Sequence, residues 1–465
     1  MTTPARASSP PGPVGSQEQG RPLPPGPKGH LLTGNIPEMA ADWLVSLTGY
    51  ARTYGDFVPL RFGPLQFVLV SDPAAIEEVL TTKNHLFVKG AGERRLGSLI
   101  GHGLLISEGD FWRRQRRLMQ PAFHRDRIAA YAGVMAAYAG QMVDSWHDGD
   151  VHPIRHEMMA VTLKVVCKAL FDMDMAGSVE TVGEALDVVI RHFDDRFASL
   201  LFLLPDQVPT PENRRYRRAV QRLDEIVDRI IEERRAQGVD RGDLLSMLLQ
   251  VQDEDGSRMT DRQLRDEVLT LVLAGHETTA LALTWALYLL AQHPQVEARL
   301  HAELDAALGG PGGRLPGLAD LPQLPYTQRV IDETLRLYPP ASLIERDALA
   351  DCVIGGYRIK KGTTLVISQW VVHRDPRFFE QPETFDPDRW ANGRAKHLPR
   401  YAYFPFGGGQ RICIGASFAM MEAAIILATI AQRYRLTLEP GQVVVPHVAI
   451  TLRPKDDILM AVHRR

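Results

Sequence analysis

The sequence predicts a mainly α-helical protein with a minor β region. Helical periodicity runs with one interruption from about residue 127 to 250, and a longer helical pattern extends from Asp261 to Gln292. Runs typical of strands are short and lie toward the two ends of the chain, at 58–71, 353–368 and 448–454. Hydrophobic residues make up 45% of the 465 residues and charged residues 23%, an ordinary globular composition that can bury a large core.

The first elements predicted are a helix and two short strands. The helix covers residues 38–54, and the strands at 58–62 and 67–71 are joined by a turn at Gly63-Pro64.

The next stretch is expected to be helical at its two ends. A helix begins after Asp72, because Pro73 suits the first helical position. Residues 87–109 are glycine-rich and are expected to be irregular, and the basic helix at 111–120 should end at Pro121.

The remaining elements are again mostly helices. A loop around 204–211 interrupts the first helical region, and later helices follow Pro294 and cover about 325–337. A proline-rich segment at 374–400 is expected to be irregular, and a final long helix should reach about residue 434.

We expect residues 1–21 to form a disordered tail and residues 22–465 to form a single domain. The tail has no apolar run near the ~20 residues of a membrane span, so neither a signal peptide nor a transmembrane anchor is expected. Acidic and basic residues nearly balance, 56 against 53, and no motif indicates nucleic acid. Three widely spaced cysteines do not indicate a disulfide framework, and they fit a reducing cytoplasm.

The most informative motif is FGGGQRICIG, which places Cys413 in a glycine-rich loop just before a helix. A thiolate there is stabilised by the helix dipole and by backbone N–H groups. Phe406 can cover the sulfur, and Arg411 can reach an anionic group beside it. This set suits a thiolate ligand to heme iron. The plainer alternative is a glycine turn before a core helix, with a buried and inert cysteine.

The same loop resembles the heme-binding loop of the cytochromes P-450, whose pattern is F-x-x-G-x-R-x-C-x-G. Phe406, Gly409, Arg411, Cys413 and Gly415 occupy its fixed positions. The resemblance extends over roughly the whole predicted domain. It implies the cytochrome P-450 fold, a triangular helical prism with a long central helix over the heme. It also implies heme b (iron protoporphyrin IX), with Cys413 as the ligand to its iron.

The middle of the long helix reads AGHETT, a poor choice for helix stability. A Thr hydroxyl there can bond back to a carbonyl one turn earlier, and Gly275 leaves room for a ligand. The segment is similar to the family signature A/G-G-x-D/E-T, which begins here at Ala274. The resemblance implies that Thr278 holds dioxygen and a water molecule and that Glu277 supplies protons. The alternative is a helix kink with a surface Glu and a capping Thr.

Glu333 and Arg336, three residues apart, are by themselves a common helix-surface pair. In the family, E-x-x-R forms a buried network with a later arginine, and Arg389 in FDPDRW matches that position. The resemblance therefore implies a structural role for all three residues.

Heme carries two propionates, which require cations or strong donors. Trp112 and Arg116 are four residues apart and share a helix face. By resemblance this face, together with Arg346 and Arg411, binds the propionates. The alternative for Trp112 and Arg116 is a packed tryptophan beside a solvated arginine.

Other arginines of the basic helix form either a solvated face or a docking site for an acidic redox partner. These are Arg113, Arg114 and Arg117, to which Arg125 is added. About 50 residues follow the cysteine loop in this sequence, so no fused flavin or iron–sulfur domain is expected. The expected electron source is a ferredoxin with its reductase, or a flavodoxin.

Substrate contacts are expected from 87–106, 192–205, the start of AGHETT, 341–344 and 449–450. These segments are largely apolar, which favours a lipophilic substrate. Their apolar candidates are Phe87, Leu96, Leu99, Ile100, Leu104, Phe197, Leu201, Phe202, Leu273, Leu343 and Ile344. The run FASLLFLL at 197–204 lines the entrance, touches a membrane surface or belongs to the core.

The function expected from all this is a heme-thiolate monooxygenase. It would use O2 and external electrons to hydroxylate or epoxidise a fatty acid, a terpenoid or a similar lipophilic molecule. A cytoplasmic monomer is expected. One alternative is a peroxide-driven peroxygenase, although members of that type usually lack the acid–Thr pair. The other is a non-catalytic heme-binding sensor or carrier.

Overall fold

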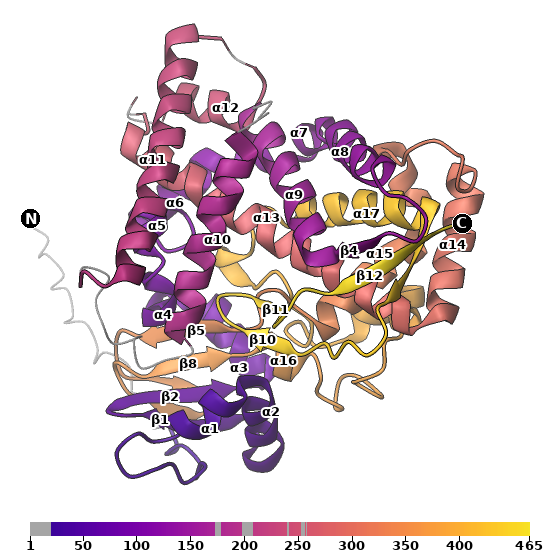
Figure 1. Cartoon of the computed structure of the whole chain (residues 1–465). Helices are drawn as coiled ribbons and strands as arrows, with labels where there is room; N and C mark the ends of the chain where they lie inside the picture. The colour runs from indigo at the N-terminus through magenta and orange to yellow at the C-terminus, as the bar shows by residue number, and fades with distance from the viewer. Residues whose placement is uncertain (1–19, 173–177, 198–207, 240, 253–255, 257) are drawn as a thin grey trace, which may run out of the picture.

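A single long helix, α13 (Asp261–Gln292), organises the molecule, as the computed structural model of the chain shows (Figure 1). Its N-terminus is capped by a reciprocal pair, in which Thr260 accepts from the Gln263 N–H and the Gln263 side chain accepts from the Thr260 N–H. Most of its side chains are buried on all sides, which is the pattern of a helix at the centre of a large core. The predicted boundaries of this helix are confirmed.

The structure describes residues 20–172, 178–197, 208–239, 241–252, 256 and 258–465. Most of the predicted tail, half of the segment 204–211 and most of the segment 197–204 lie outside these residues. The described helices besides α13 are α1 (Ile36–Ala41), α2 (Trp43–Tyr54), α3 (Pro73–Glu77), α4 (Ala91–Arg94), α5 (Gly97–Ile100), α6 (Gly109–Met119), α7 (Arg125–Ala130), α8 (Ala132–Asp144), α9 (Ile154–Phe171), α10 (Ser178–Phe197), α11 (Pro211–Gln237), α12 (Leu244–Gln250), α14 (Pro294–Leu308), α15 (Pro325–Leu337), α16 (Gln369–Val372) and α17 (Ala416–Arg433).

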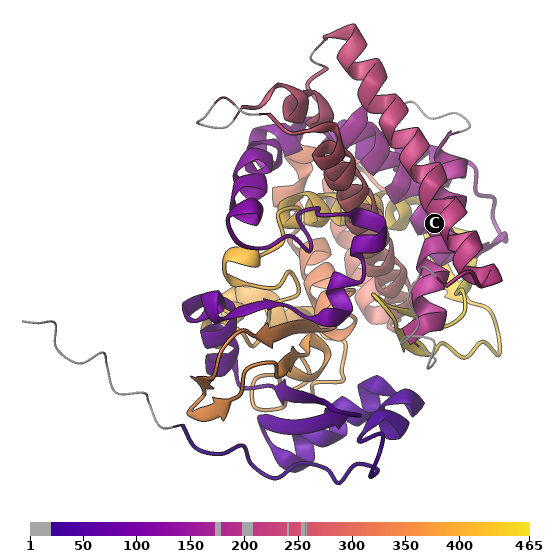
Figure 2. The same cartoon turned by 90° about the vertical axis from the view of Figure 1, so that its left-hand side faces the viewer.

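Helices pack around α13 on several sides. α9 lies along it, α11 crosses its first half, and α15 and α17 pack against its second half. Figure 2 shows α11 as the long helix on the outside of the bundle. The largest hydrophobic cluster joins α13, α14, α15 and α17, and a second joins the first half of α13 to α9, α10 and α11. The mainly α-helical prediction is confirmed.

The β region is minor, and its largest sheet lies at one end of the molecule, with α1 and α2 beside it (Figure 1). Its main sheet has five strands in the order β1-β2-β8-β5-β3, and β2 runs parallel to β8 while the other pairs are antiparallel. The described strands are β1 (Phe57–Phe62), β2 (Leu65–Val70), β3 (Phe87–Lys89), β4 (Val151–Pro153), β5 (Ile344–Ala348), β6 (Cys352–Ile354), β7 (Tyr357–Ile359), β8 (Thr364–Ile367), β9 (Tyr434–Leu438), β10 (Pro446–Val448), β11 (Leu452–Pro454) and β12 (Leu459–Arg464).

Several local predictions were wrong in detail. The helix at 38–54 is two helices, because Asp42 is extended and caps α2 through the N–H groups of Leu44 and Val45. The segment 87–109 is not irregular, since it contains β3, α4 and α5. The strand at 448–454 is a pair of short antiparallel strands, β10 and β11.

Proline acted as predicted at the basic helix. The α-helix ends at Met119, before Pro121, and the chain continues as a 3₁₀ turn over Gln120–Phe123. The segment 374–400 likewise contains a 3₁₀ stretch at Pro387–His397, broken by left-handed residues at its middle.

Among the described residues, two helices are long and apolar enough to span a membrane by composition. These are α13 and α17, and 83% and 72% of their apolar windows are buried inside the fold. Their apolar character is therefore used in the core of the described molecule.

Candidate active site

The cysteine loop is held tightly by its own backbone. The Cys413 N–H donates to the Phe406 carbonyl at 3.0 Å, and α17 begins three residues later at Ala416. Gly409 has a φ of +63°, and a Cβ there would overlap the Leu80 carbonyl. The motif thus needs glycine at position 409 both for its conformation and for its close approach to the turn after α3.

Opposing influences act on the pKa of the Cys413 thiol, and desolvation is the largest of them. Its side chain is exposed, yet surrounding protein desolvates it enough to raise its pKa. The Gly415 N–H and the Arg116 guanidinium act in the opposite direction and lower that pKa, because both favour the thiolate. The other two cysteines differ: Cys167 is buried with a thiol pKa raised to about 12 by burial, and Cys352 is half-buried.

The AGHETT segment of α13 shows the predicted back-bonding. Thr278 Oγ1 donates to the Ala274 carbonyl at 2.6 Å, and Thr279 Oγ1 donates to the Gly275 carbonyl at 3.2 Å. Ala274 is exposed and Thr278 half-buried on a helix that is otherwise almost wholly buried. The helix therefore has one accessible stripe at its middle.

Gly275 and Glu277 have partners that the sequence did not reveal. A Cβ on Gly275 would lie 3.1 Å from Val166 of α9, so this glycine permits close packing of the two helices. Glu277 is buried and accepts a hydrogen bond from Thr451 Oγ1 at 2.9 Å. Thr451 lies between β10 and β11, and no motif marks it. The alternative of a surface Glu is excluded by this burial.

The residues at the site fit a flat apolar group with an anionic edge. Ala274 and Cys413 are exposed, and Ile412 keeps 46% of its surface exposed, although apolar side chains in the surrounding helices are buried. Arg411 Nη1 is buried without a hydrogen-bond partner. A thiol, an apolar stripe and a cation with one unpaired N–H donor group are the set that a heme requires.

The four residues assigned to the propionates come from three elements near the cysteine loop. The Arg411 guanidinium lies 4.1 Å from the ring centroid of Trp112 on α6. Arg116 Nη1 donates to the Ile412 carbonyl at 2.8 Å, so both α6 residues contact the loop. Arg346 on β5 is buried and lies opposite Lys89 of β3.

Acidic residues that the sequence did not single out pair with these cations. Glu108 forms an ion pair with Arg411 and accepts from the Lys89 N–H at 2.7 Å. Glu93 lies 2.6 Å from Lys89 Nζ and 3.8 Å from Arg346 Nη1. The cations are therefore already held in place by neighbouring carboxylates.

Glu333 and Arg336 on α15 form the fully buried ion pair that the motif implied. Two guanidinium nitrogens of Arg336 donate to the two Glu333 oxygens at 2.8 Å each, and neither side chain is exposed. Arg389 Nε donates to Glu333 at 3.3 Å, and Trp390 Nε1 donates at 2.9 Å. Glu333, Arg336 and Arg389, which the motifs implied as a network, are thus in contact in the structure.

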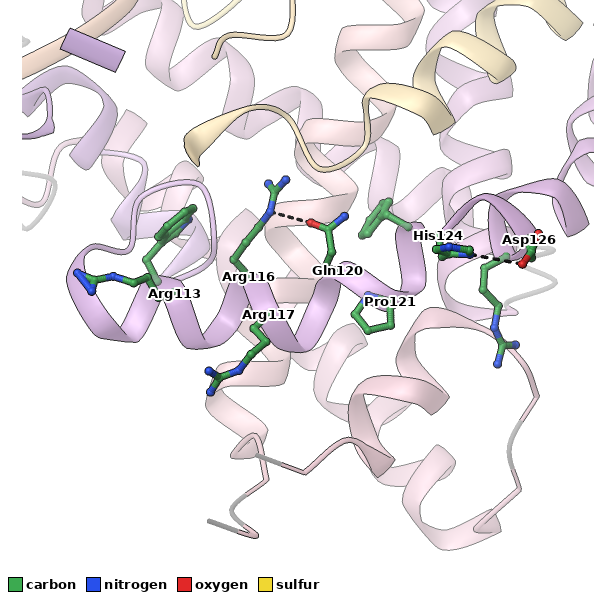
Figure 3. A pocket seen from close by; sticks show the side chains of 10 residues that line it. Arg113, Arg116, Arg117, Gln120, Pro121, His124 and Asp126 are labelled. Atoms are coloured by element: carbon green, nitrogen blue, oxygen red, sulfur yellow. Dashed lines mark hydrogen bonds and ion pairs between the residues drawn. The ribbon is translucent and has the colours of Figure 1, made fainter. Parts of the chain in front are cut away.

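A basic groove of about 910 Å³ runs along α6, the following 3₁₀ turn and the start of α7. Figure 3 shows Arg116 pointing toward the cysteine loop, while Arg113 and Arg117 point away from it. Arginines outnumber the single aspartate in its lining, which consists of Trp112, Arg113, Arg116, Arg117, Gln120, Pro121, Phe123, His124, Asp126 and Arg127. The Arg125 side chain lies outside the described part of the chain.

The candidate substrate residues do not all gather in one place. Those from 96–104 are buried in the same hydrophobic cluster as Leu273 of α13. Phe87 instead belongs to the core of the five-stranded sheet. Leu343 and Ile344 are half-buried. The side chains of Phe197, Leu201 and Phe202 lie outside the described residues.

The comparison with known families agrees with this geometry. The family model for cytochrome P450 matches residues 24–460. The chain therefore belongs to the cytochrome P450 family, whose cofactor is heme.

Relatives with similar sequences include three streptomycete proteins, of which one is named a monooxygenase and one an oxygenase. Cyclooctatin synthase of Streptomyces melanosporofaciens is 42% identical over 429 residues, which covers 92% of each chain. Cyclooctat-9-en-7-ol 5-monooxygenase of the same species is 40% identical and covers 83% of this chain and 84% of the relative. Pentalenene oxygenase of Streptomyces avermitilis is 37% identical over 86% of this chain and 88% of its own. These likenesses identify the chain as a P450 monooxygenase.

Solved structures confirm the P450 fold. The cytochrome P450DA heme domain superposes with a TM-score of 0.86 at 29% identity, covering 96% of this chain and 98% of that chain. Retinoic acid-bound cyanobacterial CYP120A1 superposes with a TM-score of 0.84 at 26% identity, covering 96% and 100%.

Proposed function

We propose that this P450 hydroxylates or epoxidises a cyclic, terpenoid-type lipophilic molecule, with Cys413 as the ligand to heme iron. The observation that carries the proposal is the cysteine loop itself, whose exposed thiol precedes α17 and receives support from Gly415 and Arg116. A bound heme b would supply the activation of O2 and the oxygen transfer.

The protein's own contribution is to hold and orient. Phe406 and Gly415 would flank the thiolate, since the Phe406 carbonyl accepts from the Cys413 N–H and Gly415 lies close to the sulfur. Trp112, Arg116, Arg346 and Arg411 would hold the propionate edge. Arg411 has one free donor nitrogen for this purpose, and Glu108 keeps its guanidinium in position. Ala274 would face the flat side of the cofactor, since a larger residue on this stripe would occupy the exposed space.

Proton delivery is assigned to the accessible stripe of α13. Thr278 Oγ1 is half-buried and bonded to the Ala274 carbonyl, so its hydroxyl oxygen can accept and pass a hydrogen bond. Glu277 is buried and is held by Thr451, so it would act as the proton donor through water or through Thr278. Gly275 lets α13 pack on α9 and so keeps this stripe in place.

The substrate class is supported by two observations. Leu96, Ile100, Leu104 and Leu273 belong to one buried apolar cluster, and a substrate site next to such residues would favour lipophilic ligands. The relatives named above act on a cyclic alkenol and on pentalenene, as their names state.

Electrons are proposed to come from a separate ferredoxin with its reductase, or from a flavodoxin. The basic groove along α6 supports this. It is lined by Trp112 and Arg116, and both residues contact the cysteine loop. We further propose that residues 22–465 form one heme domain that acts as a cytoplasmic monomer.

The decisive experiment is the reduced carbon monoxide difference spectrum of the wild type and of Cys413→His. We expect the long-wavelength band of a thiolate ligand in the wild type and its loss in the variant. Cys352→Ser, which changes a half-buried cysteine elsewhere, should keep the band. A wild-type band typical of a histidine ligand, or a band retained by Cys413→His, would contradict the proposal. Turnover with an external reductase then separates a monooxygenase from a sensor or carrier.

A further inference from the structure

Two adjacent buried acids on α13 accept hydrogen bonds from the loop at residues 101–104, which is far from them in the sequence. Asp266 Oδ2 accepts from the His102 N–H at 2.8 Å, and Glu267 Oε2 accepts from the Leu104 N–H at 2.9 Å. Asp266 and Glu267 keep only 3% and 1% of their surface exposed. Buried carboxylates are uncommon unless they have such partners, so these acids have a specific task.

Two glycines of this loop allow its backbone to contact α13 directly. Gly101 has a φ of +53°, and a Cβ there would overlap the Asp266 carboxylate. A Cβ on Gly103 would overlap Thr270 Oγ1, one turn farther along α13. Both glycines are therefore required for the two carboxylates to reach backbone N–H groups of the loop.

The two acids are anchored differently. Arg265 Nη1 donates to Asp266 at 2.8 Å, and Arg265 Nε donates to Asp224 of α11 at 2.7 Å. Glu267 has no basic partner among the described residues. Burial raises the pKa of Glu267 to about 8, and the Leu104 N–H only partly opposes this. Glu267 is thus mostly protonated near pH 7, which makes glutamine a close substitute for it.

Helix geometry places Glu267 on the same face of α13 as the accessible stripe of Ala274 and Thr278. Ala274 and Thr278 follow Glu267 by seven and eleven residues, close to two and three turns of about 3.6 residues. The three residues therefore share one face, with Glu267 about 10 Å along the axis from Ala274 at about 1.5 Å per residue. Leu104 is buried in the same cluster as Leu273.

We propose that Asp266 and Glu267 are positioning residues that fix residues 101–104 as a wall of the substrate site. The proposal rests on the proposed function, since the stripe of Ala274 and Thr278 is taken as the oxygen side of the heme. With the loop pinned to the same helix that carries this stripe, the distance between wall and reacting centre is set by one rigid element. The wall then limits how large a molecule can approach.

Glu267 is the better residue to test, because Asp266 also neutralises the buried Arg265. The variants are Glu267→Ala, which removes the acceptor, and Glu267→Gln, which retains an acceptor oxygen. Glu297→Ala on α14 is the matched control, since Glu297 is also a buried acid with a pKa raised by burial. All variants should first show the wild-type carbon monoxide spectrum.

The first readout is backbone hydrogen exchange, which does not depend on turnover. In Glu267→Ala we expect the amides of His102 and Leu104 to exchange about ten-fold faster, because one hydrogen bond between α13 and the loop is lost. Glu267→Gln and Glu297→Ala should leave these amides unchanged. Unchanged exchange in Glu267→Ala would contradict the claim that Glu267 holds residues 101–104 in place, whatever the protein's activity.

The second readout is the binding of two heme ligands of different size, imidazole and 4-phenylimidazole, followed by spectral titration and stopped flow. Glu267→Ala should bind 4-phenylimidazole several-fold faster and imidazole at the wild-type rate, because only the larger ligand meets the wall. Equal effects on both ligands, or none on either, would overturn the role as a wall. If the Cys413→His spectrum contradicts the heme ligand while the amides of Glu267→Ala still exchange faster, only the proposed function is rejected. The role of Glu267 in holding the loop would then stand.

Discussion

At the scale of single residues, the buried charge of Arg336 is surrounded by partners. Arg336 is fully buried, and besides Glu333 it donates to three backbone carbonyls, those of His373, Pro382 and Thr384. A buried pair of this kind stabilises the fold little as a whole, but removing one member leaves the other charge unpaired. The network ties α15 to the segment that precedes the cysteine loop.

This arrangement predicts that Arg336→Ala and Glu333→Ala lose about 3–5 kcal/mol of unfolding free energy and fail to retain heme. Arg389→Ala should be milder, because the Arg389 side chain is 14% exposed and its contact with Glu333 is longer, at 3.3 Å. Denaturant unfolding and heme content after gel filtration are the measurements.

The matched control is Arg299→Ala, which breaks a two-point ion pair with Asp388 on the surface, where Arg299 is 53% exposed. We expect a loss of no more than about 1 kcal/mol there. Wild-type heme content in all three network variants would show that the network has no bearing on the cofactor.

At the scale of secondary structure elements, α13 combines a structural and a chemical face. Thr278 and Thr279 are adjacent and both bond back to carbonyls one turn earlier, yet only Thr278 lies on the accessible stripe. Thr279 is buried toward the core. Neighbouring residues of the same type thus provide a test of which face carries the chemistry.

We predict that Thr278→Val diverts electrons from product to hydrogen peroxide, about ten-fold or more, because a general-acid relay is lost. Thr279→Val, which removes the same hydroxyl on the buried face, should keep the wild-type ratio of product to peroxide. Both ratios are measured with an external reductase and a lipophilic substrate that the wild type oxidises. An equal change in both variants would assign the effect to helix bending.

At the scale of the whole molecule, charge is distributed unevenly. The net charge is only −3, yet the groove along α6 gathers several arginines around the elements that contact the cysteine loop. Local potentials of this kind steer partners more than they stabilise a fold. A chain with a net charge near zero therefore carries a groove along α6 whose charge is mainly positive.

Charge reversal in this groove should slow reduction by a ferredoxin and weaken the salt dependence of that rate. We expect the combined variant Arg113→Glu and Arg117→Glu to lower the rate about ten-fold or more at low ionic strength, with little effect at high salt. Arg358→Glu, an exposed arginine on β7, is the control outside the groove. Stopped-flow reduction rates that do not differ between the two variants would indicate a merely solvated face.

Much of the fold and the core of the site could be predicted because their signals are local. The limits of α13 follow from its capping residues and its apolar run, and the cysteine loop follows from glycines and a helix start within ten residues. The family resemblance added Glu333, Arg336 and Arg389, and the structure joins them. Short strands such as β9 and β12 were missed, because few residues carry their pattern and pairing decides them.

The sequence by itself determined the class of protein, the cysteine loop and the long helix, since each depends on residues that are neighbours in the chain. Outside the Glu333 network, only the tertiary structure decided which acids meet which partners. Glu108 pairs with Arg411, Thr451 with Glu277, and Glu267 with the Leu104 N–H, each across a long stretch of chain. The physical reason is that such contacts arise from packing and burial in three dimensions, and local periodicity carries no trace of them.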